Sequence, residues 1–211
     1  MRVRWRLVIG ALIAICVLIM GYFYVSPQET NYAKKVDITK LEDVQIVNDM
    51  VLMAYASKEK AIFYYSFGLF VYDIQKQKIY RSIDLKAIDC YYINGSTATE
   101  VISTPDGRTV YIYNMGDKAD NFMYKYDVEA NKLTKMNRSE IKGQYKVVLT
   151  NDNPPDGYEE HEGAYSPAMA PIDKNTFAFM YAEGFMAKNL QLIVYNRINN
   201  EKEVYNVFHQ N

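Results

Sequence analysis

The chain has few of the residues that cross-link or activate small secreted proteins. Its 211 residues include 2 cysteines, 2 histidines and 1 tryptophan. Cys16 lies in an apolar run near the N-terminus, so Cys90 is the only cysteine after that run. The remaining chain cannot form an internal disulfide, unlike the cysteine-rich secreted modules of animals. Burial of apolar side chains must stabilise it instead. This favours a bacterial cell-surface protein, in which Cys90 is expected to be a buried apolar residue.

Patterns that bind phosphate or activate a nucleophile are also missing. The 10 glycines are scattered, and no G-x-G-x-x-G or G-x-x-x-x-G-K occurs. His161 stands in an acidic segment, and His209 lies two residues from the end, where chains often fray. Ser139 and Lys142 have the S-x-x-K spacing but no companion K-T-G. We therefore expect no catalytic residues and lean towards a protein that is not an enzyme.

The charge of the chain is nearly balanced. It contains 24 Lys and Arg against 25 Asp and Glu, a formal net charge of −1. Without residues 1–26, 21 Lys and Arg face 25 Asp and Glu, a net charge of −4. No basic stripe occurs in this part, so nucleic acid is not an expected partner.

Residues 7–25 form one uncharged apolar run, preceded by Arg2, Arg4 and Arg6. As a helix the run would span about 28 Å, close to the hydrocarbon thickness of a bilayer. The arginines should stay in the cytoplasm under the positive-inside rule. We expect residues 1–26 to be a cytoplasmic tip and single transmembrane anchor. A cleaved signal peptide and a lipid-modified Cys16 stay open as alternatives.

After residues 27–43, which read as a polar linker, the pattern is one of short strands and turns. Strand-like runs occur at 61–65, 69–73 and 78–80, again at 109–113, 122–127 and 132–134, and more loosely at 176–181, 190–196 and 203–205. The first two sets share Tyr-Asp, four residues, Lys, then Ile or Leu, as in Tyr72-Asp73 and Tyr126-Asp127. The third set has a turn that we read as two residues longer. Each set also has an entry strand, at 51–55, 101–103 and 165–167.

Turn chemistry supports this division. Pro105-Asp106-Gly107 combines a preset φ, a side chain that bonds its own backbone, and a residue that tolerates positive φ. The Asp of the shared Tyr-Asp element is expected to accept backbone N–H groups at the start of its hairpin turn. The 20 tyrosines suit half-buried strands, mainly as core residues, with a tyrosine-lined binding face as the alternative.

The sequence therefore predicts an all-β domain over residues 44–211, built of three propeller-blade-like antiparallel units after one N-terminal transmembrane helix. Three blades do not close a ring. The units could form an open arc or a sandwich, or two chains could complete a ring as a homodimer. An open arc would need its exposed edge covered by the linker or by a partner.

The segment 151–163 is the strongest candidate for metal chemistry. Its carboxylates are dense enough to hold calcium, although the spacing fails for an EF-hand, and a solvated acidic loop or a partner-docking loop are the alternatives. The candidate ligands are Asp152, Asp156, Glu159, Glu160 and Glu162. These carboxylates, or Asp117 and Asp120, would also carry acid–base chemistry if the protein were a hydrolase.

The stretch FGLFVYD at residues 67–73, with Lys78-Ile79 and residues 81–86 after it, resembles the propeller-like exported domain of BlaR/MecR-type membrane proteins of Gram-positive bacteria. The likeness covers roughly residues 60–135 and includes Cys90 and the Asp106-Gly107 turn. The Tyr-Asp hairpin also resembles WD-like and YVTN-like propeller repeats. The zinc motif of the BlaR/MecR peptidase part has no counterpart here, so the resemblance does not imply proteolysis.

These observations together predict a membrane-anchored binding or sensor protein. Its C-terminal domain should lie outside the cytoplasm and contact the bilayer through the anchor. A protein or cell-envelope component is the expected partner. The alternatives are a cell-envelope hydrolase and an accessory subunit of a membrane signalling system.

Overall fold

The computed structural model describes residues 15, 33–36, 51–65, 68–90, 97–116, 122–137, 149–150, 168–182 and 189–209. Apart from residue 15, they belong to one compact unit that spans 31–211. The expected membrane anchor lies outside the described residues, except for Ile15. Within the described part, no helix combines the length and the apolar character needed to cross a bilayer.

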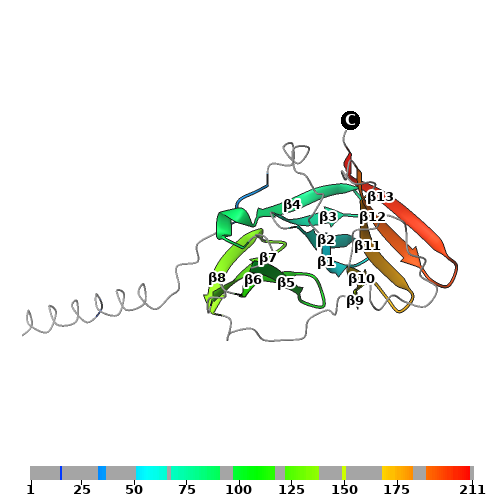
Figure 1. Ribbon diagram of the computed structural model, residues 1–211. Helices are drawn as coiled ribbons and strands as arrows, with labels where there is room; N and C mark the ends of the chain where they lie inside the picture. Colours follow the sequence, from blue (N-terminus) through cyan, green and yellow to red (C-terminus); the bar gives the residue numbers. More distant parts are fainter. Residues whose placement is uncertain are drawn as a thin grey trace, which may run out of the picture. The chain divides into compact units, whose positions relative to one another are not determined.

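The described residues of the unit are all-β apart from one short 3-10 helix, Lys86–Ile88, and their strands form three antiparallel sheets (Figure 1). Sheet 1 contains β1 (Leu52–Ala56), β2 (Lys60–Tyr64), β3 (Gly68–Asp73) and β4 (Lys78–Asp84). Sheet 2 contains β5 (Thr97–Ser103), β6 (Thr109–Gly116), β7 (Phe122–Asp127) and β8 (Lys132–Asn137). Sheet 3 contains β9 (Leu149–Thr150), β10 (Ala168–Pro171), β11 (Thr176–Ala182), β12 (Asn189–Asn196) and β13 (Glu201–His209). In each sheet, strands that lie next to each other are also consecutive in the sequence, as expected for blade-like units.

Sheet 1 packs against both of the other sheets. One cluster of buried residues joins Phe63, Phe70 and Tyr72 of sheet 1 to Met180 and Leu192 of sheet 3. A second cluster joins the opposite face of sheet 1 to sheet 2, through residues that include Ile62, Leu69, Val71, Val110 and Ile112. A strand buried on both faces reads as a continuous apolar run rather than an alternating one. This explains why β3 is buried from Gly68 to Tyr72.

The faces of sheets 2 and 3 that point away from sheet 1 are apolar as well. Sheet 2 presents Tyr111, Tyr113 and Met123 there, and sheet 3 presents Phe179 and Ile193. Each of these side chains is 7% exposed or less. None of the four clusters formed by described residues joins sheet 2 to sheet 3. These faces are therefore not free apolar surfaces, and the homodimer, one of the alternatives for closing the ring, stays a prediction.

Part of the expected linker bonds to the outer edge of sheet 1. The backbone N–H of Asp84 donates to Lys34 O at 2.7 Å, and the N–H of Val36 donates to Ser82 Oγ at 3.1 Å. Val36 also packs on the cluster between sheets 1 and 3. Residues 33–36 thus lie along β4 and satisfy backbone groups that an edge strand would otherwise expose.

The third repeat is more regular than the sequence analysis proposed. Asn196 pairs with Glu201 across the hairpin, as Asp73 pairs with Lys78 and Asp127 with Lys132. The turn is therefore equally long in all three sheets, and the expectation of a turn two residues longer was wrong. Charged residues at the start of β13, where the other sheets have Lys followed by Ile or Leu, conceal this register in the sequence.

Candidate functional site

An open cleft of about 920 Å³ lies where turns of sheets 1 and 2 meet. Its walls are Tyr55 and Ser57–Lys60 from sheet 1, Asp106 and Arg108 from the β5–β6 turn, and Asp127 and Glu129 at the β7–β8 turn. We call this the first cleft. The hairpin turns place these residues together because the β1–β2, β5–β6 and β7–β8 turns are all at the same end of the packed sheets.

Lys60 links the two walls of the first cleft. Its ammonium lies 3.4 Å from Glu129 Oε1 and 5.9 Å from the centre of the Tyr55 ring. The Lys60 side chain is 14% exposed, whereas that of Glu129 is 65% exposed. The ion pair itself adds little stability, because one partner is well solvated. Its effect is to place a fixed positive charge in the wall of the cleft.

The Pro105-Asp106-Gly107 turn packs on sheet 1, as well as closing its own hairpin. Gly107 has φ +65°, and a Cβ there would come within 2.5 Å of the Tyr55 ring. Both the backbone conformation and the contact therefore require glycine. The prediction of a tight turn at this place is confirmed, and the turn brings Asp106 to the rim of the first cleft.

Asp106 is held in its ionised form. Its Oδ1 accepts hydrogen bonds from the Arg108 backbone N–H at 3.0 Å and from Thr104 Oγ1 at 2.7 Å. These bonds, and the charge of Arg108, lower the pKa of the carboxyl below its ordinary value. A carboxyl with a lowered pKa is a poor general acid at neutral pH but a good anionic hydrogen-bond acceptor.

Arg81 ties the outer part of the two walls together. It is on β4, and its Nε and Nη2 each donate to backbone oxygens of the β7–β8 turn, Val128 and Glu129, at 3.4 Å. Its guanidinium also lies 5.6 Å from the centre of the Tyr80 ring. Because Arg81 bonds the backbone of the turn, it fixes the position of Glu129 relative to sheet 1.

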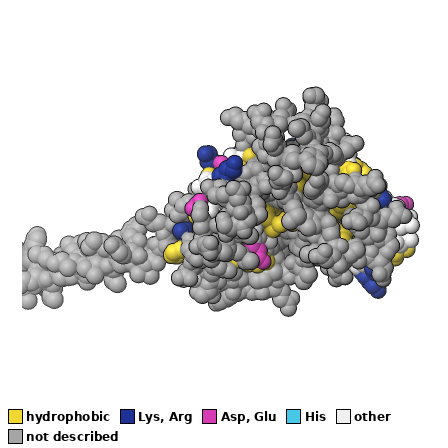
Figure 2. Space-filling view, in the orientation of Figure 1, with side chains coloured by type: hydrophobic (Ala, Val, Ile, Leu, Met, Phe, Trp, Pro, Cys, Tyr) yellow, Lys and Arg dark blue, Asp and Glu magenta, His cyan; other side chains and the backbone are white. Residues whose placement is uncertain are grey.

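The first cleft can bind and orient a polar group, and its described residues do not form a nucleophile–base pair. Ser57 Oγ accepts the backbone N–H groups of Glu59 and Lys60, at 3.2 and 3.1 Å, so this hydroxyl serves the turn. The lining includes Lys58, Lys60 and Arg108 besides four carboxylates. Charged side chains of both signs are also visible on the face that Figure 2 shows. Mixed charges of this kind suit a partner that itself carries both signs.

Several residues singled out in the sequence lie outside the described residues. They are Asp117, Asp120, Asp152, Asp156, Glu159, Glu160, His161 and Glu162. The calcium and hydrolase hypotheses therefore stay predictions. Among the residues that the structure describes, no group of three or more His, Cys, Asp or Glu is arranged to hold a metal ion.

The described cysteine and tyrosines behave mainly as core residues. Cys90 is buried in the cluster between sheets 1 and 2, as predicted. Of the tyrosines whose burial the structure describes, none is exposed, and Tyr65, Tyr72 and Tyr126 are among the largest fully buried side chains. In this part of the chain, the core role of tyrosine is the one observed.

Sequence reasoning missed Lys60, Arg81 and Glu129 as site residues. The entry turns of the first two repeats end in charged residues, at Lys60 and Arg108, and this was the available signal. Each residue by itself reads as a solvated charge on a strand end or a turn. Only the packing of sheet 1 on sheet 2 brings these charged residues together around the first cleft.

Comparison with models of known protein families finds no match for the chain, and comparison with curated proteins finds none either. The resemblance to BlaR/MecR-type proteins stays a prediction that rests on the residues given above.

Proposed function

We propose that this chain is a membrane-anchored binding protein. Its β domain would lie outside the cytoplasm and hold a protein or cell-envelope partner in the first cleft without catalysing a reaction. The partial propeller of three blade-like sheets would be the scaffold, and the apolar run at residues 7–25 would be the tether. The resemblance to an exported propeller-like domain is in keeping with this arrangement.

One observation carries the proposal: the first cleft presents charged groups that are already fixed in place. Asp106 is kept ionised by two hydrogen bonds, and Lys60 is held between Tyr55 and Glu129. Groups that are ordered before a partner arrives lose little conformational entropy when it binds. A catalytic role is less well supported, because the lowered pKa of Asp106 removes it as a general acid.

Site-specific crosslinking in the native membrane tests the binding role. A photoreactive residue at Glu59, in the first cleft, should capture a defined partner. The same residue at Ala87, exposed in the 3-10 helix Lys86–Ile88 after β4 and outside the cleft, should not. Lys60→Glu should abolish the capture while the melting temperature shows that the domain is still folded. Equal capture from both positions, or none from either, would contradict the proposal.

Protease treatment of whole cells tests the location. If the domain lies outside the cytoplasm, added protease should remove it while a cytoplasmic marker stays intact. Survival of the domain in intact cells, followed by its loss after lysis, would place it on the other side of the membrane.

A further inference from the structure

A second, smaller cleft of about 390 Å³ lies between turns of sheets 1 and 3. Ser57 and Lys58 line both clefts, so the β1–β2 turn separates them. The two clefts are therefore neighbours at the same end of the packed sheets, and one extended partner could occupy both.

The second cleft has an apolar floor and an acidic rim. Ile74, Ile172 and Val194 line it and also belong to, or pack against, the cluster between sheets 1 and 3. Asp173, Glu201 and Glu203 line it as well, and Lys58 is the one cation among its described lining residues. Asp173 Oδ1 accepts the backbone N–H groups of Asn175 and Thr176, which keeps the carboxylate in position.

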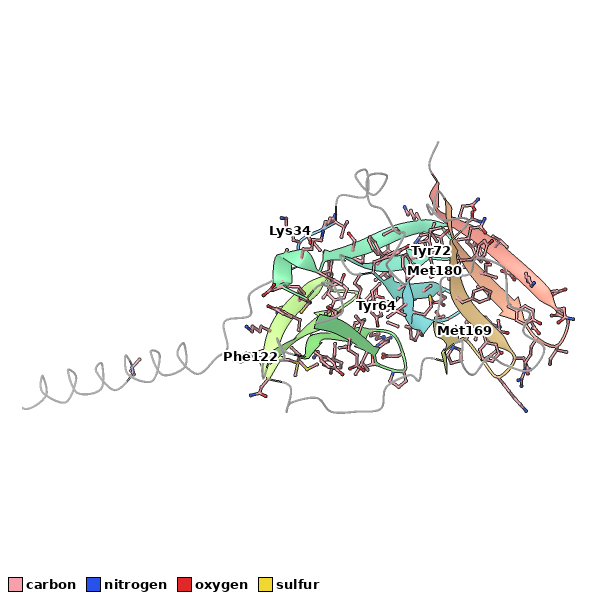
Figure 3. The ribbon with its side chains drawn as sticks, viewed as in Figure 1. Lys34, Tyr64, Tyr72, Phe122, Met169 and Met180 are labelled. Atoms are coloured by element: carbon pink, nitrogen blue, oxygen red, sulfur yellow. The ribbon has the colours of Figure 1, made fainter. Side chains whose placement is uncertain are left out.

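A buried tyrosine belongs to the cluster on which this floor packs. Tyr72 is 0% exposed, and among the described residues its hydroxyl has no hydrogen-bond partner. The corresponding hydroxyls in the other sheets donate towards the following turn, from Tyr126 to Asn131 and from Tyr195 to Asn200. Tyr72 lies near the turn end of β3, two residues before Ile74, which lines the second cleft. Figure 3 places Tyr72 beside Met180 of sheet 3, and Tyr205 at the cleft belongs to the same cluster.

We propose that the second cleft receives a lysine or arginine side chain of the polypeptide partner that the first cleft holds. A long cationic side chain has an aliphatic stem and a charged head. The stem would lie on Ile74, Ile172 and Val194, and the head would reach the carboxylates of Asp173, Glu201 and Glu203. This inference rests on the proposed binding function for the nature of the partner.

Calorimetric titration of the full chain in detergent micelles tests it with two synthetic peptides. Both are capped alanine–glycine peptides, one with a central lysine and the other with norleucine, which keeps the stem and lacks the ammonium. The lysine peptide should bind at least about tenfold more tightly, as a charge-assisted hydrogen bond predicts. Its affinity should fall with added salt, because the rim carboxylates are exposed.

Three variants locate the binding. Glu201→Gln with Glu203→Gln should weaken lysine-peptide binding by about threefold to tenfold. Tyr72→Phe removes a buried hydroxyl that does not line the cleft, and it should leave the affinity unchanged. The control Asp89→Asn, which removes an exposed carboxylate that lines neither cleft, should leave the affinity unchanged.

Equal or absent binding of the two peptides would overturn the inference, as would full affinity in the Glu201→Gln, Glu203→Gln variant. These failures are separate from failure of the proposed function. Crosslinking from Glu59 can still identify a partner if the second cleft does not recognise lysine, and the peptide result is independent of where the domain resides.

Discussion

At the residue scale, one hydrogen bond distinguishes sheet 1 from the other two sheets. Sheets 2 and 3 each have an asparagine with φ near +54° before their last strand, Asn131 at 53° and Asn200 at 55°. The Oδ1 of each asparagine accepts a hydrogen bond from a tyrosine hydroxyl, from Tyr126 at 2.8 Å in sheet 2 and from Tyr195 at 2.7 Å in sheet 3. Sheet 1 has Gln77 at φ 50° in the corresponding place, and the hydroxyl of its tyrosine, Tyr72, has no hydrogen-bond partner in the described part of the chain. Asparagine tolerates this left-handed conformation better than glutamine does.

Gln77→Asn should therefore stabilise the protein. The shorter asparagine side chain can accept a hydrogen bond from the Tyr72 hydroxyl, as in the other sheets. Asparagine also tolerates a positive φ better than glutamine does. We expect the free energy of unfolding to rise by about 1 kcal/mol, measured by urea denaturation. The reverse change, Asn131→Gln, should lower it by a similar amount. If Gln77→Asn and Asn131→Gln change stability in the same direction, the two positions are not equivalent.

At the element scale, the three sheets repeat the same backbone contacts at their turns. In each sheet, the residue after the next-to-last strand donates its N–H to the carbonyl of the residue just before the preceding strand. The bonds are Ile74 to Glu59, Val128 to Arg108 and Arg197 to Asn175, at 2.9 to 3.0 Å. Asp73 and Asp127 each accept a backbone N–H of the following turn at 2.8 Å, as predicted. The repeat is therefore clearer in hydrogen bonds than in sequence.

The β4 edge provides a test of how residues 33–36 are held. In Ser82→Ala, the Val36 N–H loses its acceptor, the Oγ of a residue that is 5% exposed. We expect a loss of about 1 kcal/mol in the free energy of unfolding, and faster hydrogen exchange at the Val36 amide. Ser82→Thr keeps the hydroxyl and should keep the protection. Unchanged exchange in the alanine variant would mean that the contact with Ser82 does not hold this segment.

At the scale of the whole molecule, sheet 1 is the centre because both of its faces are buried by its neighbours. This position explains its aromatic content. The rings of Phe63 and Phe70 stack at 5.4 Å, and Tyr65 meets both edge-on. Tyr64 of β2 and Tyr126 of β7 pack where sheet 1 meets sheet 2, and their removal from water raises their pKa well above the ordinary value.

Burial of phenols predicts that the protein loses stability in alkali. Burial also raises the pKa of Tyr205 to about 12, helped by its hydrogen bond to Glu203. Above the ordinary tyrosine pKa of 10.0 the unfolded chain loses protons that the folded chain keeps. Tyrosine ionisation should therefore leave the free energy of unfolding unchanged below that pH. The free energy of unfolding should fall as the pH rises above it.

The measurement is urea denaturation at a series of alkaline pH values, with tyrosinate absorbance followed in parallel. Tyr126→Phe loses the bond to Asn131 but should show a shallower decline with pH, because one buried phenol no longer titrates. Ionisation of all tyrosines near their ordinary pKa in the still-folded protein would contradict the burial seen in the core.

The sequence alone determined the fold class, the three blade-like units and the turn at Pro105-Asp106-Gly107. These follow from local rules: alternation, turn residues and the Tyr-Asp element act within a few neighbouring positions. The length of the third turn was missed because Glu201 and Lys202 stand where the other repeats have Lys and an apolar residue. When the side chains that mark a repeat are replaced, a comparison of local sequence no longer shows which residues of the two strands pair.

Only the tertiary structure decided which sheets are neighbours and where the clefts lie. Lys60 and Glu129 are 69 residues apart in the chain, and nothing in either local sequence predicts that they pair. Their contact depends on sheet 1 packing one face on sheet 2 and the other on sheet 3. That choice is made by the fit of whole apolar faces, which many residues share, so no single motif records it.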